Sequence, residues 1–359
     1  MRHFHTLTVK QVRRETDDCV SVTFNVAPEL KEHFAFIQGQ YLTLRTTING
    51  EDVRRSYSIC SGVDEELRVA IKEVDGGKFS TWANSNLKAG DTIDVMPPMG
   101  RFYVELEPTA SRHHVAFAAG SGITPVLSLA KTTLAKEPNS TFTLFYVNKT
   151  STSIIFKEEL ENLKDRYMSR FRLFHILTRE PGDLEMFSGR LDKSRCQQIC
   201  STFVDVTEAD AFFVCGPEAM IHAVKDTLAE IGVDATKVHF ELFTTAAATA
   251  EKSVTSSTQK TERSGMTARV EVVLDGNRIE FDLPYDGQNV LDAALARGAD
   301  LPFSCKGGVC CTCRALLVEG EVKMDVNYSL EPDELERGYI LTCQAHPITE
   351  HIVVDFDQQ

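Results

Sequence analysis

Four cysteines near the C-terminal end have a spacing that suits an iron–sulfur cluster. Cys305, Cys310 and Cys313 form a C-x4-C-x2-C run, and Cys343 follows after twenty-nine further residues. A plant-type [2Fe–2S] cluster takes this spacing because one tight loop supplies three thiolates and a distant segment supplies the fourth. Structural zinc sites usually show paired C-x2-C knuckles. The spacing therefore favours an iron–sulfur cluster over the alternative, a zinc knot.

The residues around these cysteines fit the same kind of site. Gly307 and Gly308 allow a tight loop whose backbone N–H groups can point at sulfur. Cys311 stands between two predicted ligands and should point away from them, so we interpret it as a bystander thiol. The other cysteines are scattered, and most of them are expected to be small buried residues: Cys19, Cys60, Cys196, Cys200 and Cys215.

A second group of chemically useful residues lies near position 55. Arg55 can hold a pyrophosphate by two hydrogen bonds, Tyr57 can lie against a flat ring, and Ser58 can hydrogen-bond a ring nitrogen. Further along, Gly77-Lys-Phe79-Ser80 is typical of a helix start, where free N–H groups favour a phosphate. Each motif also occurs without a ligand, as an ordinary strand or as a glycine turn before a helix.

Two glycine-bearing segments lie between strand-like and helix-like runs. In Gly120-Ser-Gly122-Ile-Thr124-Pro125 the glycines allow close approach to a pyrophosphate, and the proline suits a first helical turn. The segment Cys215-Gly216-Pro217-Glu218 ends another strand-like run. Ligands of open α/β sheets bind at the carboxyl ends of the strands, so the two turns could hold one dinucleotide. The alternative is that each segment is only a turn into a helix.

The elements that must position these motifs fall into two patterns. The first hundred residues contain short alternating β-rich runs, which are typical of a barrel: 6–13, 19–25, 40–47, 54–60 and 67–74. From about residue 111 strands alternate with helices, which indicates a parallel sheet wrapped by helices. The predicted strands are 114–118, 141–147, 171–177 and 211–215, and the predicted helices are 125–134, 155–163 and 219–231.

The segment 244–267 differs from both patterns. Its small and polar residues can bury little surface, so it is predicted to be a flexible linker, with a helix over 246–252 as the alternative. A hairpin of strands 269–274 and 278–283, turning at 275–277, follows it, and a helix over 289–297 precedes the cysteine loop. The predicted domains are 1–107, 108–243 and 268–359, with the linker between the last two.

Charge and hydropathy narrow the classes of partner. The 359 residues carry a net charge of −14, and residues 266–359 alone hold 17 Asp or Glu against 7 Lys or Arg. Nucleic-acid binding requires a basic face, so we expect no nucleic-acid partner. The acidic end suits a transient partner with a basic patch, or it is simply a solvated surface. No apolar run is long enough to span a membrane and no signal-peptide core begins the chain, so a cytoplasmic protein is expected.

Six motifs occur in the order seen in the ferredoxin–NADP reductase superfamily, which the chain resembles over residues 5–243. They are Arg55-x-Tyr57-Ser58, Gly77-Lys-Phe-Ser80, Met-Pro-Pro-Met-Gly100-Arg-Phe102, Gly120-Ser-Gly122-Ile-Thr-Pro125, Cys215-Gly216-Pro217 and Glu241-Leu-Phe243. The resemblance implies an FAD-binding β-barrel, a Rossmann-like parallel α/β nucleotide domain and, after the linker, a β-grasp plant-type ferredoxin domain. Hydride would pass from a nicotinamide dinucleotide to FAD, and single electrons would pass on through the [2Fe–2S] cluster.

The resemblance also implies roles for individual residues. It places FAD on Arg55, Tyr57, Ser58, Ile71, Lys72, Gly77, Phe79 and Ser80, with Phe243 near the isoalloxazine face. It places the dinucleotide on Gly120, Gly122, Thr124, Pro125, Cys215, Gly216, Pro217 and Glu218. Ser58 and Cys215 would be catalytic, beside flavin N5 and the hydride-donating carbon. Cys305, Cys310, Cys313 and Cys343 would bind the metal cluster.

The preferred dinucleotide is predicted from the residues after two strands. An NAD-selective site places Asp or Glu on the ribose 2′-hydroxyl, but no acid occurs in Asn148-Lys149-Thr150-Ser151. Lys149 and Arg179 could instead meet a 2′-phosphate, or they could be solvated charges. The sequence therefore favours NADPH.

The ferredoxin-like segment has a narrower resemblance. Lys306-Gly-Gly-Val-Cys310, the run from Val322 to Leu335 and Gly338-Tyr-Ile-Leu-Thr-Cys343-Gln344 resemble the reductase components of phenylacetyl-CoA epoxidases. This resemblance implies electron delivery to a di-iron oxygenase in phenylacetate catabolism. The alternatives are the reductase of another multicomponent hydroxylase, such as a steroid ring hydroxylase, and a non-enzymatic redox sensor.

Overall fold

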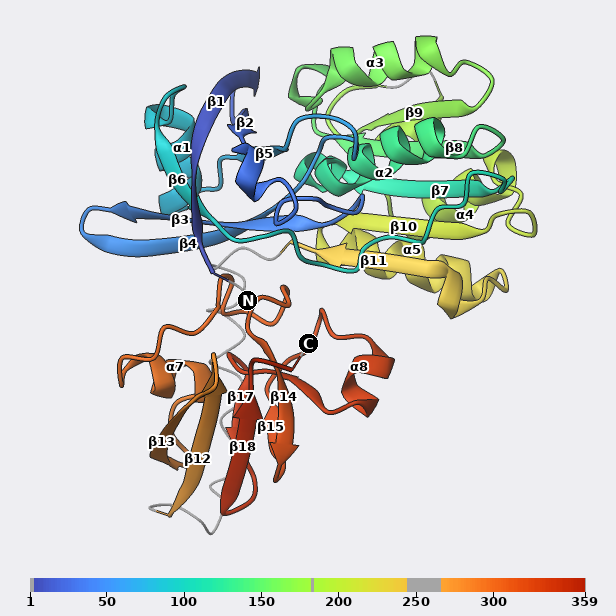
Figure 1. Ribbon diagram of the computed structural model, residues 1–359. Coiled ribbons are helices and arrows are strands. Elements are labelled where there is room, and N and C mark those ends of the chain that lie inside the picture. The colour runs from blue at the N-terminus through green and yellow to red at the C-terminus, as the bar shows by residue number, and fades with distance from the viewer. Residues whose placement is uncertain (1–2, 182–183, 244–265, 359) are drawn as a thin grey trace. The chain divides into compact units, whose positions relative to one another are not determined.

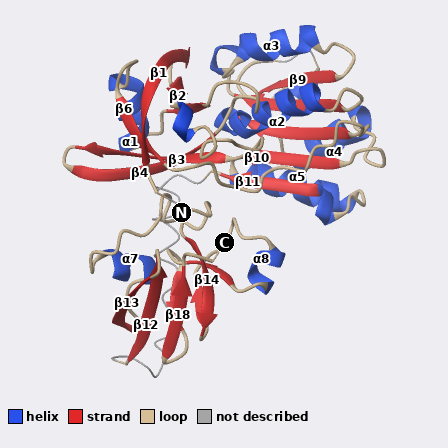
Figure 2. Ribbon diagram, viewed as in Figure 1, coloured by secondary structure: helices blue, strands red, loops and turns tan. Residues whose placement is uncertain are grey.

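The computed structural model describes residues 3–181, 184–243 and 266–358, which form two compact units. One unit holds residues 4–53 and 57–243, and the other holds mainly residues 266–358. Figure 2 shows that strands form the frame of both units. The predicted linker 244–267 lies outside the described residues except for its last two, and Thr267 already begins a strand.

The first unit begins with an antiparallel barrel of six strands in the order β4-β3-β6-β1-β2-β5 (Figure 1). The strands are β1 (His5–Thr16), β2 (Cys19–Asn25), β3 (Tyr41–Ile48), β4 (Glu51–Ser58), β5 (Arg68–Lys72) and β6 (Thr92–Val95). A β-bridge between Ile59 and Val69 joins the two outer strands and closes the barrel. Because of this closure, the residues that end β4 lie beside β5.

A helix follows β5 directly and covers the barrel. Helix α1 (Lys78–Asn86) buries Phe79 and Ala83 among the barrel's apolar residues. Its N-cap is Gly77, where an added Cβ would lie 2.4 Å from the Ser80 hydroxyl and 2.9 Å from the Val74 carbonyl oxygen. The turn into α1 therefore requires glycine. The predicted helix start at this position is confirmed.

The same unit continues with a five-stranded sheet in the order β11-β10-β7-β8-β9, in which every neighbouring pair is parallel. The strands are β7 (His113–Ala119), β8 (Thr141–Asn148), β9 (Phe171–Leu177), β10 (Ala211–Gly216) and β11 (Val238–Leu242). The helices are α2 (Ile123–Lys136), α3 (Lys157–Arg166), α4 (Lys193–Phe203) and α5 (Glu218–Glu230). The predicted parallel α/β domain is confirmed.

Helices cover both faces of this sheet, which explains why its central strands β10, β7 and β8 are buried along nearly their whole length. Helices α2 and α3 share one buried cluster with Ala118, Leu144 and Tyr146. On the other face Phe117, Phe145 and Phe174 stack across three strands with ring centroids 5.0 Å apart. A phenylalanine at the end of α4 extends this row, and α5 packs beside it.

Ion pairs join the barrel to the α/β domain inside the first unit. Arg68 of β5 donates two hydrogen bonds, of 2.6 and 2.9 Å, to the carboxylate of Glu159 on α3. Lys131 of α2 pairs with Glu159 as well and with Glu65 at 2.6 Å. Ser128 of α2 also donates to the Ser61 carbonyl oxygen at 2.7 Å. These contacts hold the two domains of this unit together.

The second unit is a mixed five-stranded sheet in the order β13-β12-β18-β14-β16, with a separate pair β15-β17. The strands are β12 (Thr267–Leu274), β13 (Asn277–Pro284), β14 (Arg314–Glu319), β15 (Val322–Met324), β16 (Tyr339–Leu341), β17 (Ala345–Pro347) and β18 (His351–Asp355). The helices are α7 (Val290–Leu295) and α8 (Pro332–Glu336). A hairpin, a helix on the sheet and a parallel β12–β18 pair in its middle make this the expected β-grasp domain.

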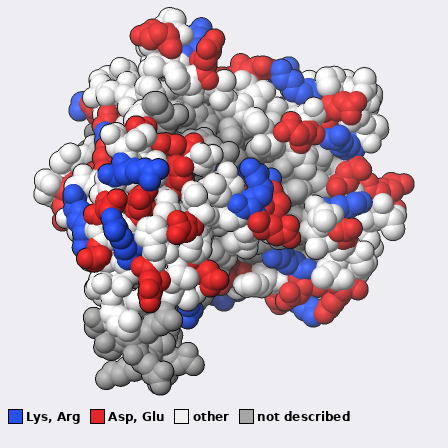
Figure 3. Space-filling model, turned by 60° about the horizontal axis from the view of Figure 1, so that its bottom comes forward, with Lys and Arg blue, Asp and Glu red and all other residues white. Residues whose placement is uncertain are grey.

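The structure also shows the length and hydropathy of the helices and the distribution of charge on one face. Within the part of the chain that the structure describes, no helix is long and apolar enough to cross a membrane. Figure 3 shows acidic and basic side chains interspersed over the face turned to the viewer.

Candidate functional site

The end of β4 brings the predicted flavin residues to the closing seam of the barrel. Arg55 and Tyr57 are half-buried and Ser58 is buried, 3% exposed. The Tyr57 ring lies 5.5 Å, between centroids, from Phe79 on α1. Because Ile59 bridges to Val69, the β5 residues Ile71 and Lys72 belong to the same seam. The structure therefore brings together the predicted flavin residues of β4, β5 and α1.

Some of these side chains are buried, or already form hydrogen bonds or ion pairs within the protein. Phe79 is 1% exposed and Ile71 is fully buried, so neither side chain offers surface to a cofactor. The Ser80 hydroxyl accepts from the Val74 N–H and donates to the Gly77 carbonyl oxygen. Lys72 pairs with Asp18 at 3.3 Å. Arg55 and Tyr57 are thus the predicted flavin residues of this group that are only half-buried, whereas the buried Ser58 donates its hydroxyl to Glu241.

The two glycine turns meet at the carboxyl end of the parallel sheet. A Cβ added to Gly122 would lie 2.1 Å from the Cys215 carbonyl oxygen, so glycine is required for the two turns to touch. Gly120 has φ of +53°, and a Cβ added there would meet nothing within 4 Å. The Tyr146 hydroxyl donates to the Gly120 carbonyl oxygen at 3.0 Å and fixes the turn from β8. Open space beside a fixed glycine turn is what an approaching pyrophosphate requires.

The remaining residues predicted at this end flank the two turns. Thr124 donates to the Ser121 carbonyl oxygen at 2.9 Å, and the buried Pro125 lies in the first turn of α2. Pro217 is the N-cap of α5, and Glu218 is its first residue. The N-termini of α2 and α5 therefore face the same edge of the sheet, as the sequence predicts.

Ser58, Cys215 and Glu241 converge although they come from three separate strands. Ser58 Oγ donates to Glu241 Oε2 at 3.3 Å. Cys215 of β10 pairs in register with Glu241 of β11. Cys215 is fully buried, and this burial, with the nearby carboxylate of Glu241, raises the pKa of its thiol well above the usual value. The protonated thiol is therefore the form present near neutral pH.

Glu241 is missing from the predicted site residues. It occurs in the Glu241-Leu-Phe243 motif, and a carboxylate at the end of a parallel strand is the signal that could have identified it. Phe243 follows β11 directly and is 36% exposed, which leaves its ring available for contact.

Lys149 and Arg179 lie side by side at the ends of β8 and β9. The Arg179 N–H donates to the Lys149 carbonyl oxygen at 2.9 Å, and both residues are exposed. The structure also places an acidic residue, Glu180 after β9, beside the segment 148–151 at the end of β8. Glu180 Oε2 accepts from the Ser151 N–H at 2.9 Å, so a carboxylate does stand beside that segment.

The four predicted cluster ligands come together in the C-terminal unit. The Sγ atoms of Cys305 and Cys310 are 3.1 Å apart, and the Cys313 and Cys343 side chains are within hydrogen-bonding reach of each other. Among the described Cys, His, Asp and Glu side chains, no three converge as ligands of one metal ion would. The four thiols agree in number with the four cysteine ligands of a [2Fe–2S] cluster.

Hydrogen-bond donors around the thiols also fit a cluster. The Gly307 N–H donates to Cys305 Sγ at 3.3 Å, and Lys306 supports the turn with a positive φ of 52°. Cys311 turns the other way, because its Sγ donates to the Ser329 carbonyl oxygen at 3.2 Å. Burial raises the pKa of the Cys311 thiol to about 12. The pair arrangement and the inward N–H groups agree with a [2Fe–2S] site that excludes Cys311.

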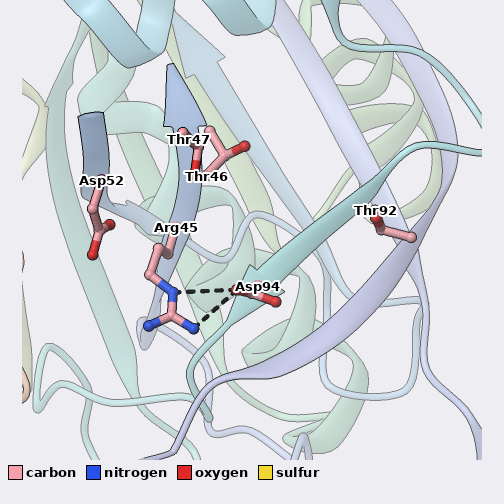
Figure 4. A pocket seen from close by; sticks show the side chains of 6 residues that line it. All are labelled: Arg45, Thr46, Thr47, Asp52, Thr92 and Asp94. Atoms are coloured by element: carbon pink, nitrogen blue, oxygen red, sulfur yellow. Dashed lines mark hydrogen bonds and ion pairs between the residues drawn. The ribbon is translucent and has the colours of Figure 1, made fainter. Parts of the chain in front are cut away.

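A polar pocket on the barrel is separate from all of these residues. Arg45, Thr46, Thr47, Asp52, Thr92 and Asp94 line a cavity of about 510 Å³ on strands β3, β4 and β6 (Figure 4). Asp94 accepts two hydrogen bonds from the Arg45 guanidinium, at 2.9 and 3.2 Å. None of its lining residues belongs to the predicted flavin, dinucleotide or cluster residues.

Comparison with known families and proteins agrees with three successive modules. Residues 6–103 match the oxidoreductase FAD-binding domain, residues 117–226 the oxidoreductase NAD-binding domain, and residues 272–347 the 2Fe-2S iron-sulfur cluster binding domain. The chain is 42% identical to a component of the 1,2-phenylacetyl-CoA epoxidase of Escherichia coli K12, over 99% of both chains. It is 34% identical to the ferredoxin reductase component of 3-ketosteroid-9-alpha-monooxygenase of Rhodococcus rhodochrous, over 98% of this chain and 96% of that protein.

A solved structure shows the same fold. Phthalate dioxygenase reductase aligns with a TM-score of 0.59 and 23% identity over 98% of both chains.

Proposed function

Because the chain belongs to the flavin- and [2Fe–2S]-dependent reductase components of oxygenases, we propose that it serves a phenylacetyl-CoA epoxidase. The observation that carries the proposal is 42% identity to a component of such an epoxidase along the full length of both chains. Its reaction as an NAD(P)H-dependent electron-transfer enzyme follows from the three modules. The proposed partner is a di-iron oxygenase that binds phenylacetyl-CoA.

The bound cofactors supply the chemistry: FAD takes a hydride and releases electrons singly, and a [2Fe–2S] cluster carries one electron at a time. The chain supplies position and charge. Arg55 would hold the FAD pyrophosphate, and Tyr57 would cover the flavin ring. Ser58 Oγ, bonded to Glu241, would hold a proton at the ring edge. The turns at Gly120 and Gly216 would hold the dinucleotide so that it reaches the flavin.

The cluster ligands in this proposal are Cys305 with Cys310 and Cys313 with Cys343. Three observations support this assignment. The Sγ atoms of Cys305 and Cys310 are 3.1 Å apart, the Cys313 and Cys343 side chains are within hydrogen-bonding reach, and the Gly307 N–H donates to Cys305 Sγ.

The proposed electron donor is NADPH. Lys149 and Arg179 are exposed neighbours whose charges suit a 2′-phosphate, whereas Glu180 beside Ser151 is the feature that would suit the 2′-hydroxyl of NADH. The ratio of kcat/KM for NADPH to that for NADH tests the choice. We expect Lys149→Ala and Arg179→Ala each to lower this ratio. Glu180→Gln should raise it or leave it unchanged. A parent enzyme that prefers NADH would overturn the NADPH assignment.

The partner is tested by reconstitution. Mixed with the oxygenase components of a phenylacetyl-CoA epoxidase, the protein should oxidise NADPH at a rate that depends on phenylacetyl-CoA. The second candidate, supported by 34% identity along the chain, is a 3-ketosteroid monooxygenase reductase. Steroid-dependent NADPH oxidation with the ketosteroid oxygenase, and none with the epoxidase, would favour it. Rapid NADPH-driven reduction of cytochrome c would exclude a redox sensor, whereas a purified protein without flavin would favour it over both.

A further inference from the structure

The cysteine site is assembled from two distant segments, and one side chain bridges them. Gln344 is 8% exposed and follows Cys343 directly. Its Nε2 donates to the Lys306 carbonyl oxygen at 3.1 Å and to Cys343 Sγ at 3.5 Å. One amide group therefore contacts the cysteine loop and the distant thiol at the same time.

The orientation of this amide follows from its partners. A carbonyl oxygen only accepts hydrogen bonds, so the nitrogen end of Gln344 must face Lys306. The NH₂ group has two hydrogens, and the second is then directed to Cys343 Sγ. The Lys306 side chain turns away from this contact, because its ammonium pairs with Asp292 at 2.6 Å.

Neighbouring residues leave the amide little freedom. A Cβ added to Gly308 would lie 3.4 Å from Gln344 Cγ and 2.9 Å from Val326 Cγ2. The Gln344 carbonyl oxygen also accepts from the Asp325 N–H at 3.0 Å. Side chain and backbone of Gln344 are thus both fixed against the cysteine loop.

We propose that Gln344 is a positioning residue whose amide donates to the Cys343 sulfur and raises the reduction potential of the cluster. The inference rests on the proposed cluster ligands. Reduction adds one electron, so negative charge on the sulfurs grows and a hydrogen bond to sulfur stabilises the reduced form more than the oxidised form. Removing the donor should therefore make reduction harder.

The test is a dye-mediated dithionite titration of the full-length protein, with the reduced cluster followed by electron paramagnetic resonance. Gln344→Met keeps the length of the side chain and removes the donor. At the midpoint potential of the parent protein, we expect the ratio of reduced to oxidised cluster to fall by about five- to tenfold. An unchanged midpoint in a variant that retains its cluster would overturn the proposal.

Thr342→Val is the matched control. The Thr342 hydroxyl donates at 2.9 Å to the carbonyl oxygen of Cys313, not to a sulfur, and Thr342 is fully buried beside Cys343. This variant should lose stability yet keep the parent midpoint. An equal fall of the midpoint potential in both variants would show that it comes from a general disturbance of the cysteine site and not from the lost hydrogen bond to sulfur.

A measurement on the unsubstituted protein covers the case in which Gln344→Met loses its cluster. With glutamine labelled by ¹⁵N in the side-chain amide, the reduced cluster should show one weakly coupled ¹⁵N nucleus. Absence of that coupling would overturn the proposal. The titration and the labelling use dithionite only, so their failure is distinct from a failure of NADPH oxidation or oxygenase coupling.

Discussion

Individual residues in this chain acquire their chemistry from partners that are far away in the sequence. Ser58 and Glu241 are 183 positions apart and form a hydrogen bond of 3.3 Å. Cys215 lies in register with the same glutamate, inside the sheet. A hydroxyl bonded to a carboxylate can pass or hold a proton, whereas a buried protonated thiol can only provide shape and a weak donor. This difference separates the roles expected of Ser58 and Cys215.

Glu241→Gln should slow flavin reduction. The amide keeps the size of the side chain but removes the negative charge beside the Ser58 hydroxyl. We expect the rate of flavin reduction by NADPH to fall by about tenfold or more, with the FAD content unchanged. Stopped-flow absorbance of the flavin measures the rate. An unchanged rate in a variant that retains FAD would rule out a function for this pair.

Substitution of single cysteines separates ligands from bystanders. Cys305→Ser, Cys310→Ser, Cys313→Ser or Cys343→Ser should remove the cluster while NADPH still reduces the flavin. Cys311→Ser should retain it, because Cys311 Sγ bonds the Ser329 carbonyl oxygen. Iron content and the visible spectrum measure the result. Loss of the cluster in Cys311→Ser together with its retention in Cys313→Ser would contradict the ligand assignment.

At the scale of elements, the sequence predicts those strands and helices that are determined by the residues within them and by the turns beside them. Residues 19–25 and 171–177 form the strands predicted for them, because short β-rich runs between turn residues have few alternatives. The hairpin of β12 and β13 and the helix after Pro217 are also confirmed. The glycine turns at the ends of β7 and β10 are where the sequence places them.

Other elements could not be predicted because tertiary contacts define them. Strand β6 has four residues, and the short strands β15 and β16 have three each. Such strands are stabilised by their neighbours more than by their own residues. Helix α4, with polar residues over much of its length, is absent from the predicted elements, as is β11, which supplies Glu241. The hydrogen bond between Ser58 and Glu241 depends on the contact between the barrel and the parallel sheet, which no local sequence pattern predicts.

The ion pairs between β5, α2 and α3 should stabilise the first unit in a pH-dependent way. Burial tends to raise the pKa of the Glu159 carboxyl, but the hydrogen bonds from Arg68 and the nearby Lys131 outweigh it, and the net pKa is lowered. A lowered folded-state pKa contributes stability above the unfolded-state pKa, near 4.3. This stability is lost as the pH falls through the folded-state value.

Glu159→Gln should therefore destabilise the protein at pH 7 by about 2 kcal/mol, less than a fully buried pair would cost. The corresponding fall in Tm is about 4–8 °C, measured by calorimetry of the flavin-loaded protein. The difference from the parent should shrink as the pH falls from the unfolded-state pKa through the lower folded-state pKa of this carboxyl. Glu66→Gln is the control, since Glu66 pairs with Lys10 while 61% of its side chain is exposed. Equal losses in the two variants would contradict the role of the buried pair.

At the scale of the whole molecule, charge is distributed unevenly along the chain. Residues 266–359 carry an excess of 10 negative charges out of the net −14, although they are about a quarter of the length. The 2Fe-2S cluster binding domain, from which we propose that electrons pass to the oxygenase, lies in this acidic part. The flavin and nucleotide residues lie in the nearly balanced remainder. The two halves of the reaction should therefore respond differently to salt.

We expect electron delivery to the oxygenase to slow when ionic strength rises from about 0.05 to 0.5 M, because salt shortens the range over which charge steers encounter. Reduction of the flavin by excess NADPH should change much less, since the residues proposed to bind the dinucleotide belong to the part of the chain whose charge is nearly balanced. Oxygenase-dependent NADPH oxidation and stopped-flow flavin reduction, each measured over a salt series, separate the two steps. Replacing exposed acids that lie outside the cysteine loop, such as Glu319 and Glu321, by glutamine tests whether the charge acts at long range. If delivery proves insensitive to salt while the flavin step is slowed, the acidic surface has no part in partner encounter.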